Sequence, residues 1–214
     1  AALADLVGGG ARRPSREAEL LAVKEKVADL LFELQPQQSL AAALRAALPD
    51  DGIVVSEMTQ MGYYSSVGLP IYEPRTYLTP GYQGTLGYGY ATALGAQVGH
   101  PERRVVALCG DGGFMYNVQE LATAKQHNIP LVGVVFNDGA FGNVKRMQKA
   151  RLGGQTHATE LQNPDFVALA RSFGVVGLRA ETPDAFAGTL REALATNEPV
   201  LIDVPIGEVR SLWR

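Results

Sequence analysis

The chain has 214 residues, of which 46% are hydrophobic and 19% charged, and its formal net charge is −3. This composition excludes disordered, collagen-like and coiled-coil chains, and the absence of a basic stripe argues against a nucleic-acid partner. The length favours one domain with one sizeable core. The single cysteine, Cys109, lies in an apolar run. We expect it to pack in the core of a cytoplasmic protein, since a lone thiol suits a reducing compartment.

The first residues, AALADLVGGG, precede Arg12 and Arg13, which is the reverse of the charge order in a signal peptide. We expect residues 1–14 to be a linker or the tail of a preceding domain, and residues 15–214 to form the functional domain. The chain is then either the last domain of a longer polypeptide or a separate subunit. A long stretch without charged residues follows Arg75, but its glycines and prolines make it a poor membrane span.

Short β-branched runs alternate with helical patterns along the rest of the chain. An amphipathic helix is expected from Ser15 to Leu34, where Leu and Val return at three- and four-residue steps. The other expected elements, in chain order, are a helix from Ser39 to Pro49, a strand at 53–55, a helix after Thr59, a strand at 105–109, a helix at 118–127, a strand at 131–136, a helix after Gly139, a helix at 164–173, a strand at 175–178, a helix after Thr182 and a strand at 200–204. Asn117 and Glu120 have the spacing of a capping box for the helix at 118–127. This alternation predicts a doubly wound α/β domain with a parallel sheet and helices on both faces.

Two of the expected strands end in turns that combine glycines with a carboxylate. The first turn is Gly110-Asp111-Gly112-Gly113, and the second begins Asn137-Asp138-Gly139-Ala140. If the strands are neighbours, Asp111 and Asp138 face each other, and this like-charge pair is costly unless a cation lies between them. The glycines let backbone N–H groups approach a phosphate. The pattern therefore indicates a metal-bridged diphosphate site.

The motif Gly110-Asp111-Gly112 is separated by residues 113–136 from Asn137-Asp138. This arrangement resembles the signature of thiamin-diphosphate-dependent enzymes, in which the second element is usually Asn-Asn. The sequence from Gly84 to Asp138 is similar to the diphosphate-binding domain of the acetolactate synthase, benzoylformate decarboxylase and pyruvate decarboxylase group. The similarity extends over most of the chain. The resemblance implies a 2-oxo acid decarboxylase or carboligase that uses thiamin diphosphate and Mg²⁺, but it does not identify the substrate.

The resemblance also implies roles for individual residues. Asp111, Asp138 and the carbonyl of Ala140 are the expected metal ligands, and Asn137 is expected to brace the turn. The residues expected to contact the cofactor are Thr59, Gln60, Gly84, Leu86, Gly110, Asp111, Gly112, Gly113, Asp138 and Ala140. In this group the carbonyl at the position of Gly84 accepts a hydrogen bond from the aminopyrimidine, and Leu86 is the apolar wedge that keeps the cofactor bent.

Two features depart from the family pattern. Asp138 stands where Asn is usual, so either metal affinity rises or cofactor affinity without metal falls. The activating glutamate of the family belongs to a pyrimidine-binding domain that the 214 residues do not contain, and Glu57 is not assigned this role. We therefore expect no catalytic residue in this chain and no activity without that domain. We expect the domain to lie in the same polypeptide or in a partner subunit. The tyrosines, all between Tyr63 and Tyr116, favour an interface in a homo-oligomer.

Two other functions are compatible with parts of the pattern. The chain could be a non-catalytic binding or regulatory module that has kept the fold, although the intact acid pair argues against this. Gly87-Tyr88-Gly89, with Asp111 at a later strand end, mimics a nicotinamide-dinucleotide fingerprint. Against that reading, Thr92 stands at the third glycine position and no clean strand leads into Gly87.

Overall fold

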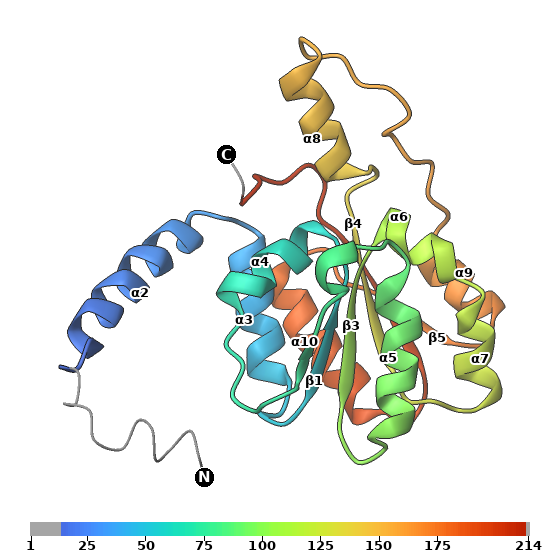
Figure 1. Ribbon diagram of the computed structural model, residues 1–214. Coiled ribbons are helices and arrows are strands. Elements are labelled where there is room, and N and C mark those ends of the chain that lie inside the picture. Colours follow the sequence, from blue (N-terminus) through green and yellow to red (C-terminus); the bar gives the residue numbers. More distant parts are fainter. Residues whose placement is uncertain (1–13, 213–214) are drawn as a thin grey trace. The chain divides into compact units, whose positions relative to one another are not determined.

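A computed structural model describes residues 14–212 of the chain (Figure 1). The internal contacts divide the chain into two units, Ala1–Glu33 and Leu34–Arg214. Residues 1–13 of the expected linker lie outside the described residues.

The described part of the first unit contains the expected N-terminal helix, α2 (Glu17–Phe32). Acidic residues occupy its first turn, where their negative charge interacts favourably with the positive end of the helix dipole. Arg16 forms an ion pair with Glu19 at 2.6 Å. Several of its apolar side chains, such as Leu20 and Leu30, are more than half exposed.

The second unit is built around a parallel six-stranded sheet, which confirms the predicted fold class. Its strands are β1 (Ile53–Ser56), β2 (Tyr77–Leu78), β3 (Val105–Gly110), β4 (Val132–Asn137), β5 (Val176–Arg179) and β6 (Val200–Pro205). The spatial order is β2-β1-β3-β4-β6-β5, and every neighbouring pair runs parallel. All five strands that the apolar runs predict are present, whereas the short edge strand β2 carries too weak a pattern to be expected.

Helices cover both faces of this sheet (Figure 1). They are α3 (Gln37–Ala47), α4 (Gln60–Gly68), α5 (Tyr88–Gly99), α6 (Asp111–Phe114), α7 (Glu120–Gln126), α8 (Gly142–Arg151), α9 (Phe166–Ser172) and α10 (Pro183–Ala195), with the 3₁₀ turns η1 (Gly81–Gln83) and η2 (Met115–Asn117). Helices α5 and α9 pack on one face of the sheet, and α10 packs on the other together with α3. Helix α8 projects beyond the carboxyl edge of the strands (Figure 1).

The core follows the two-residue alternation of the strands. Val105, Ala107 and Cys109 of β3 belong to one buried cluster with Tyr90 of α5 and Phe166 of α9. The alternate residues Val106 and Leu108 face the other helical layer and are also fully buried. Each fully buried large side chain contributes about 1.5–3 kcal/mol. Cys109 is a free, buried thiol, as predicted.

The connections place the ligand-binding edge of the sheet. Strands β1 and β3 lie side by side although the chain forms β2 between them, so the order reverses at this point. In open parallel sheets the crevice outside the carboxyl ends of the strands at such a switch point is where ligands bind. Among the described residues no helix is both long and apolar enough to cross a membrane.

The expected capping box before α7 is wrong. The cap residue of α7 is Gln119, and no side chain caps the helix. The Nδ2 of Asn117 instead donates to the carbonyl of Gly87 at 2.6 Å. Asn117 therefore braces the turn before α5, because a tertiary contact competes with the local capping interaction.

Candidate functional site

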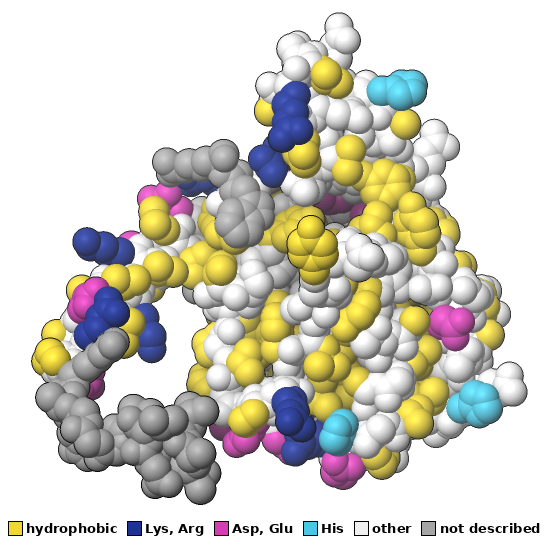
Figure 2. All heavy atoms as spheres, viewed as in Figure 1, with side chains coloured by type: hydrophobic (Ala, Val, Ile, Leu, Met, Phe, Trp, Pro, Cys, Tyr) yellow, Lys and Arg dark blue, Asp and Glu magenta, His cyan; other side chains and the backbone are white. Residues whose placement is uncertain are grey.

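A cavity of about 270 Å³ opens at the carboxyl edge of the sheet, where β1, β3 and β4 end. Figure 2 shows it as a hollow below α8, with acidic side chains visible inside it and apolar side chains around its opening. Its lining residues are Met58, Thr59, Gln60, Tyr63, Gly84, Leu86, Gly110, Asp111, Gly112, Gly113, Asp138, Ala140, Phe141, Gly142, Asn143 and Val144. All ten residues named from the sequence as cofactor contacts are in this set. Four separate turns therefore meet at one cavity.

Asp111 and Asp138 face each other at one side of this cavity. They follow β3 and β4, which are adjacent and paired at Gly110 and Phe136. Burial, with the negative charge of the nearby Asp111 as a second cause, raises the pKa of Asp138 to about 7. A like-charge pair that is partly removed from water is stabilised by a proton or by a cation.

Asp111 is held by several donors. It is 2% exposed, and its Oδ1 accepts the N–H of Gly112 at 2.9 Å. Its Oδ2 accepts the N–H of Gly139 at 2.9 Å and Nδ2 of Asn163 at 2.6 Å. Asn163 also donates to Oδ1 of Asn137 at 3.0 Å, so Asn137 lies beside the pair as a bracing residue. The sequence did not single out Asn163, because its partner Asp111 lies 52 residues away.

The segment after Asp138 is held in place by backbone pairing. Ala140 forms an isolated antiparallel bridge with Glu160, in which Phe141 N–H bonds to Thr159 and Gly139 accepts from Leu161, each at 2.8 Å. Neither bond uses the carbonyl of Ala140.

Two carboxylates and a main-chain carbonyl are the oxygen ligands that Mg²⁺ prefers. The described residues contain no group of three or more His, Cys, Asp or Glu side chains that could by themselves hold a metal ion. The donors at this edge therefore fit a hard cation that takes its remaining ligands from a bound anion or water.

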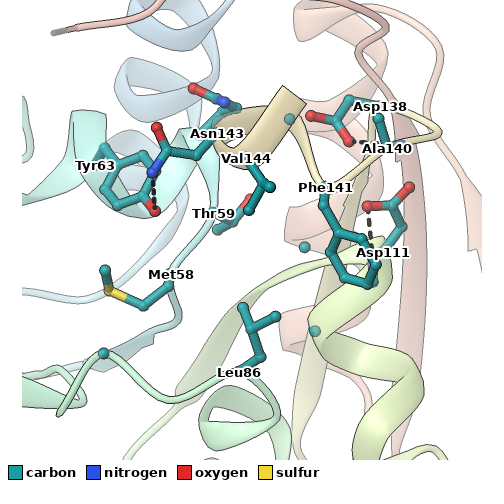
Figure 3. Close-up of a pocket in the computed structure, with 16 residues that line it drawn as sticks. Met58, Thr59, Tyr63, Leu86, Asp111, Asp138, Ala140, Phe141, Asn143 and Val144 are labelled. Carbon is teal, nitrogen blue, oxygen red and sulfur yellow. Dashed lines mark hydrogen bonds between the residues drawn. The ribbon is translucent and has the colours of Figure 1, made fainter. Parts of the chain in front are cut away.

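The other side of the cavity is apolar at its base and polar at its wall. Figure 3 shows Leu86 and Met58 below, with Tyr63 and Asn143 across the cavity from the acid pair. Nδ2 of Asn143 donates to the hydroxyl of Tyr63 at 3.4 Å, and Arg146 donates to Oδ1 of Asn143 at 2.7 Å. The cavity therefore has an acidic end, whose chemistry suits a cation, and an apolar floor, whose chemistry suits a ring system.

The N-terminus of α5 is occupied by the chain's own carboxylate. Oε1 of Glu57 accepts the N–H of Gly87, the residue that caps α5. A dinucleotide fingerprint needs this helix terminus for a phosphate. Such a fingerprint also begins with a strand that runs directly into the glycine turn. Here the turn η1 precedes Gly87, and the short strand β2 ends before η1. The geometry therefore does not support the nicotinamide reading of Gly87-Tyr88-Gly89.

Comparisons with known proteins agree with this geometry. The family described as "Thiamine pyrophosphate enzyme, C-terminal TPP binding domain" matches residues 57–204. The chain is 36% identical over 182 residues to the acetolactate synthase large subunit of Haemophilus influenzae, covering 84% of this chain and 32% of that protein. It is 34% identical over 202 residues to a probable 2-ketoarginine decarboxylase of Pseudomonas aeruginosa, covering 90% of this chain and 36% of the relative.

A solved structure shows the same likeness. The thiamine diphosphate-dependent 4-hydroxybenzoylformate decarboxylase of Rhodococcus jostii superposes with a TM-score of 0.75 at 34% identity, over 80% of this chain and 32% of that one. The chain thus spans about a third of the length of each of these relatives.

Proposed function

Because the chain belongs to the thiamin-diphosphate-dependent enzymes, as their C-terminal cofactor-binding domain, we propose that its cavity holds the diphosphate end of thiamin diphosphate through Mg²⁺. The observation that carries this proposal is the facing pair of Asp111 and Asp138 at the ends of neighbouring strands. A divalent cation between them offsets their repulsion and at the same time attracts a diphosphate.

Each lining segment has a part in this proposal. Asp111, Asp138 and the carbonyl of Ala140 hold the metal, while the turn from Gly110 to Gly113 presents backbone N–H groups to the diphosphate. Thr59 and Gln60, at the start of α4, hold the other side of the diphosphate. Helix α4 has nine residues, and its N-terminal N–H groups favour an anion.

The apolar floor serves the organic part of the cofactor. Leu86 is half-buried and lies in the cavity, where it supports the bent conformation, and the carbonyl of Gly84 accepts from the aminopyrimidine. When bound, the cofactor supplies the electron sink for breaking or forming a bond next to a carbonyl carbon. The chain's residues bind it, orient it and exclude water from it.

For the reaction we propose decarboxylation of a 2-oxo acid or ligation of the resulting fragment to a carbonyl compound. The relatives named above include a synthase and decarboxylases, so the family covers both outcomes. The chain's own cavity favours neither, because its wall residues Tyr63 and Asn143 are polar but uncharged.

Catalysis also requires groups that the described residues do not supply. We propose that a pyrimidine-binding domain, in the same polypeptide or in a partner subunit, contributes the activating glutamate and that the chain by itself is inactive. The exposed rings of Tyr82 and Tyr116 near the cavity are suited to such an interface in a homo-oligomer, because aromatic residues are enriched at contacts. A reducing cytoplasm suits the free thiol of Cys109.

Two experiments test the proposal. Calorimetric titration of the chain with thiamin diphosphate, with and without Mg²⁺, is expected to show metal-dependent binding. An assay of the protein that contains this chain and the pyrimidine-binding domain, with a panel of 2-oxo acids, then separates the reactions. Carbon dioxide release that needs no aldehyde acceptor identifies a decarboxylase, whereas an acceptor-dependent product identifies a carboligase.

A further inference from the structure

Glu57 is a buried carboxyl group directly after β1, and it is 2% exposed. Its Oε1 accepts the N–H of Gly87, whereas its Oε2 has no hydrogen-bond partner in the structure. Burial raises the pKa of Glu57 to about 7, against the opposing effect of nearby backbone N–H groups, which include those of Gly87, Gly89 and Gly110. Removing an acidic group from water costs free energy, so the buried position of Glu57 calls for a physical explanation.

The side chain of Glu57 lies against two glycines, at each of which an added Cβ would be crowded by Glu57 as it is placed. A Cβ at Gly89 would lie 3.1 Å from Cβ of Glu57, and a Cβ at Gly113 would lie 2.6 Å from its carboxyl carbon. Gly89 is in the first turn of α5, and Gly113 is in the turn that carries Asp111. The carboxyl group therefore fills the space between these two segments.

We propose that Glu57 is a positioning residue that sets the separation between the Leu86 wedge and the metal-binding turn of Asp111. The proposal rests on the proposed function of this cavity. Gly87, whose N–H the carboxyl accepts, directly follows Leu86, and Gly113, which the carboxyl contacts, lies two residues after Asp111. Glu57 thus joins the part of the site that bends the cofactor to the part that holds its diphosphate.

Two substitutions of Glu57 separate the effect of its side-chain position from the effect of its charge. Glu57→Gln keeps the length of the side chain and an acceptor oxygen, whereas Glu57→Asp keeps the acid but shortens the reach by one CH₂. The matched control is Glu73→Asp, the same change at an exposed glutamate. If position is what matters, Gln retains the function of Glu57 and Asp does not.

The test measures the affinity of the chain for two ligands and the rate of hydrogen exchange at one backbone amide. Inorganic pyrophosphate with Mg²⁺ engages only the metal end, whereas thiamin diphosphate with Mg²⁺ also engages the wedge. In Glu57→Asp we expect affinity for thiamin diphosphate to fall about tenfold, as for the loss of one buried hydrogen bond. Pyrophosphate affinity is expected to stay unchanged, and hydrogen exchange at the Gly87 amide is expected to accelerate. Glu57→Gln and Glu73→Asp are expected to resemble the unmodified chain in all three measurements.

Equal losses for both ligands, in step with a lower melting temperature, would overturn the proposal in favour of a purely structural role. So would an unchanged Gly87 amide in Glu57→Asp. If the unmodified chain binds neither ligand, the proposed function of the cavity fails. The exchange rate at Gly87, measured without any ligand, still decides whether Glu57 holds this turn.

Discussion

Nδ2 of Asn163 donates to Oδ2 of Asp111 at 2.6 Å, although the two residues are 52 positions apart in the chain. Asn163 belongs to the segment that returns from α8, and it also donates to Asn137 at 3.0 Å. It therefore orients the carboxylate of Asp111 from outside the two turns that we propose to bind the metal. Groups that orient metal ligands in this way strongly affect metal affinity.

Replacing Asn163 should therefore weaken metal-dependent binding without abolishing it. We expect Asn163→Ala to lower the affinity for Mg²⁺ with pyrophosphate about tenfold, because Asp111 loses its side-chain donor. Calorimetric titration measures this change. The control is Gln162→Ala, the neighbouring exposed amide, which should bind like the unmodified chain. An unchanged affinity in Asn163→Ala would show that the contact does not support the metal.

Removing the wedge should affect only the organic part of the cofactor. Leu86→Ala takes an apolar side chain from the cavity floor, and we expect thiamin diphosphate affinity to fall about tenfold, as for loss of one large apolar contact. Affinity for pyrophosphate with Mg²⁺ should remain. Thr85→Ala, at the exposed neighbour, is the control. A parallel loss of pyrophosphate binding would contradict the assigned position of the wedge.

The ring cluster beneath the metal turn should govern stability. Phe114 makes edge-to-face contacts with Tyr90 at 5.4 Å and with Phe166 at 5.9 Å between ring centroids. Phe114→Ala is expected to lower the free energy of unfolding by about 3–5 kcal/mol, because it leaves a cavity in a dense core. Tyr116→Ala, at a largely exposed ring close by, should change it little. Denaturant unfolding followed by circular dichroism distinguishes the two.

The buried carboxyl of Glu57 should make stability depend on pH. Its pKa is about 7 in the folded chain against an ordinary 4.5, so the folded state binds more protons between these values. Unfolding therefore releases a proton in this range, so the contribution of Glu57 to stability is complete below about pH 4.5, falls as pH rises and is lost above about pH 7. Denaturant unfolding at pH 5 and pH 8 measures the difference.

Glu57→Gln cannot titrate, so this part of the pH dependence should disappear in that variant. The pKa of Asp138 is raised in the same direction, and both chains are therefore compared in an Asp138→Asn background. If Glu57→Gln keeps the full difference in stability between pH 5 and pH 8, the carboxyl of Glu57 does not titrate in this range.

The sheet and the acid pair could be predicted from sequence because their signals are local. Short apolar runs rich in β-branched residues, such as 105–109, predict buried strands, and the glycine turns that follow them mark the ligand edge. Once β3 and β4 pair as neighbours, Asp111 and Asp138 must meet at the same edge.

The supporting residues could not be predicted in this way, because their partners are distant in sequence. Glu57 and Asn117 each contact Gly87 from 30 residues away, and Asn163 reaches Asp111 from 52. Asn117 even has the local spacing of a capping residue, and only the folded arrangement shows that its side chain turns to Gly87 instead. Polar residues that brace a site have no periodic pattern of their own.

The most direct test of the whole account is a calorimetric titration of thiamin diphosphate with Mg²⁺ into the unmodified chain, Asp111→Ala and Asp138→Asn. Asp138→Asn keeps an oxygen at that proposed ligand position and removes one of two repelling charges, whereas Asp111→Ala removes the proposed ligand that is buried and held by three donors. The account predicts metal-dependent binding that survives in Asp138→Asn and is abolished in Asp111→Ala. Equal losses in the two variants, or binding in Asp111→Ala as tight as in the unmodified chain, would contradict it.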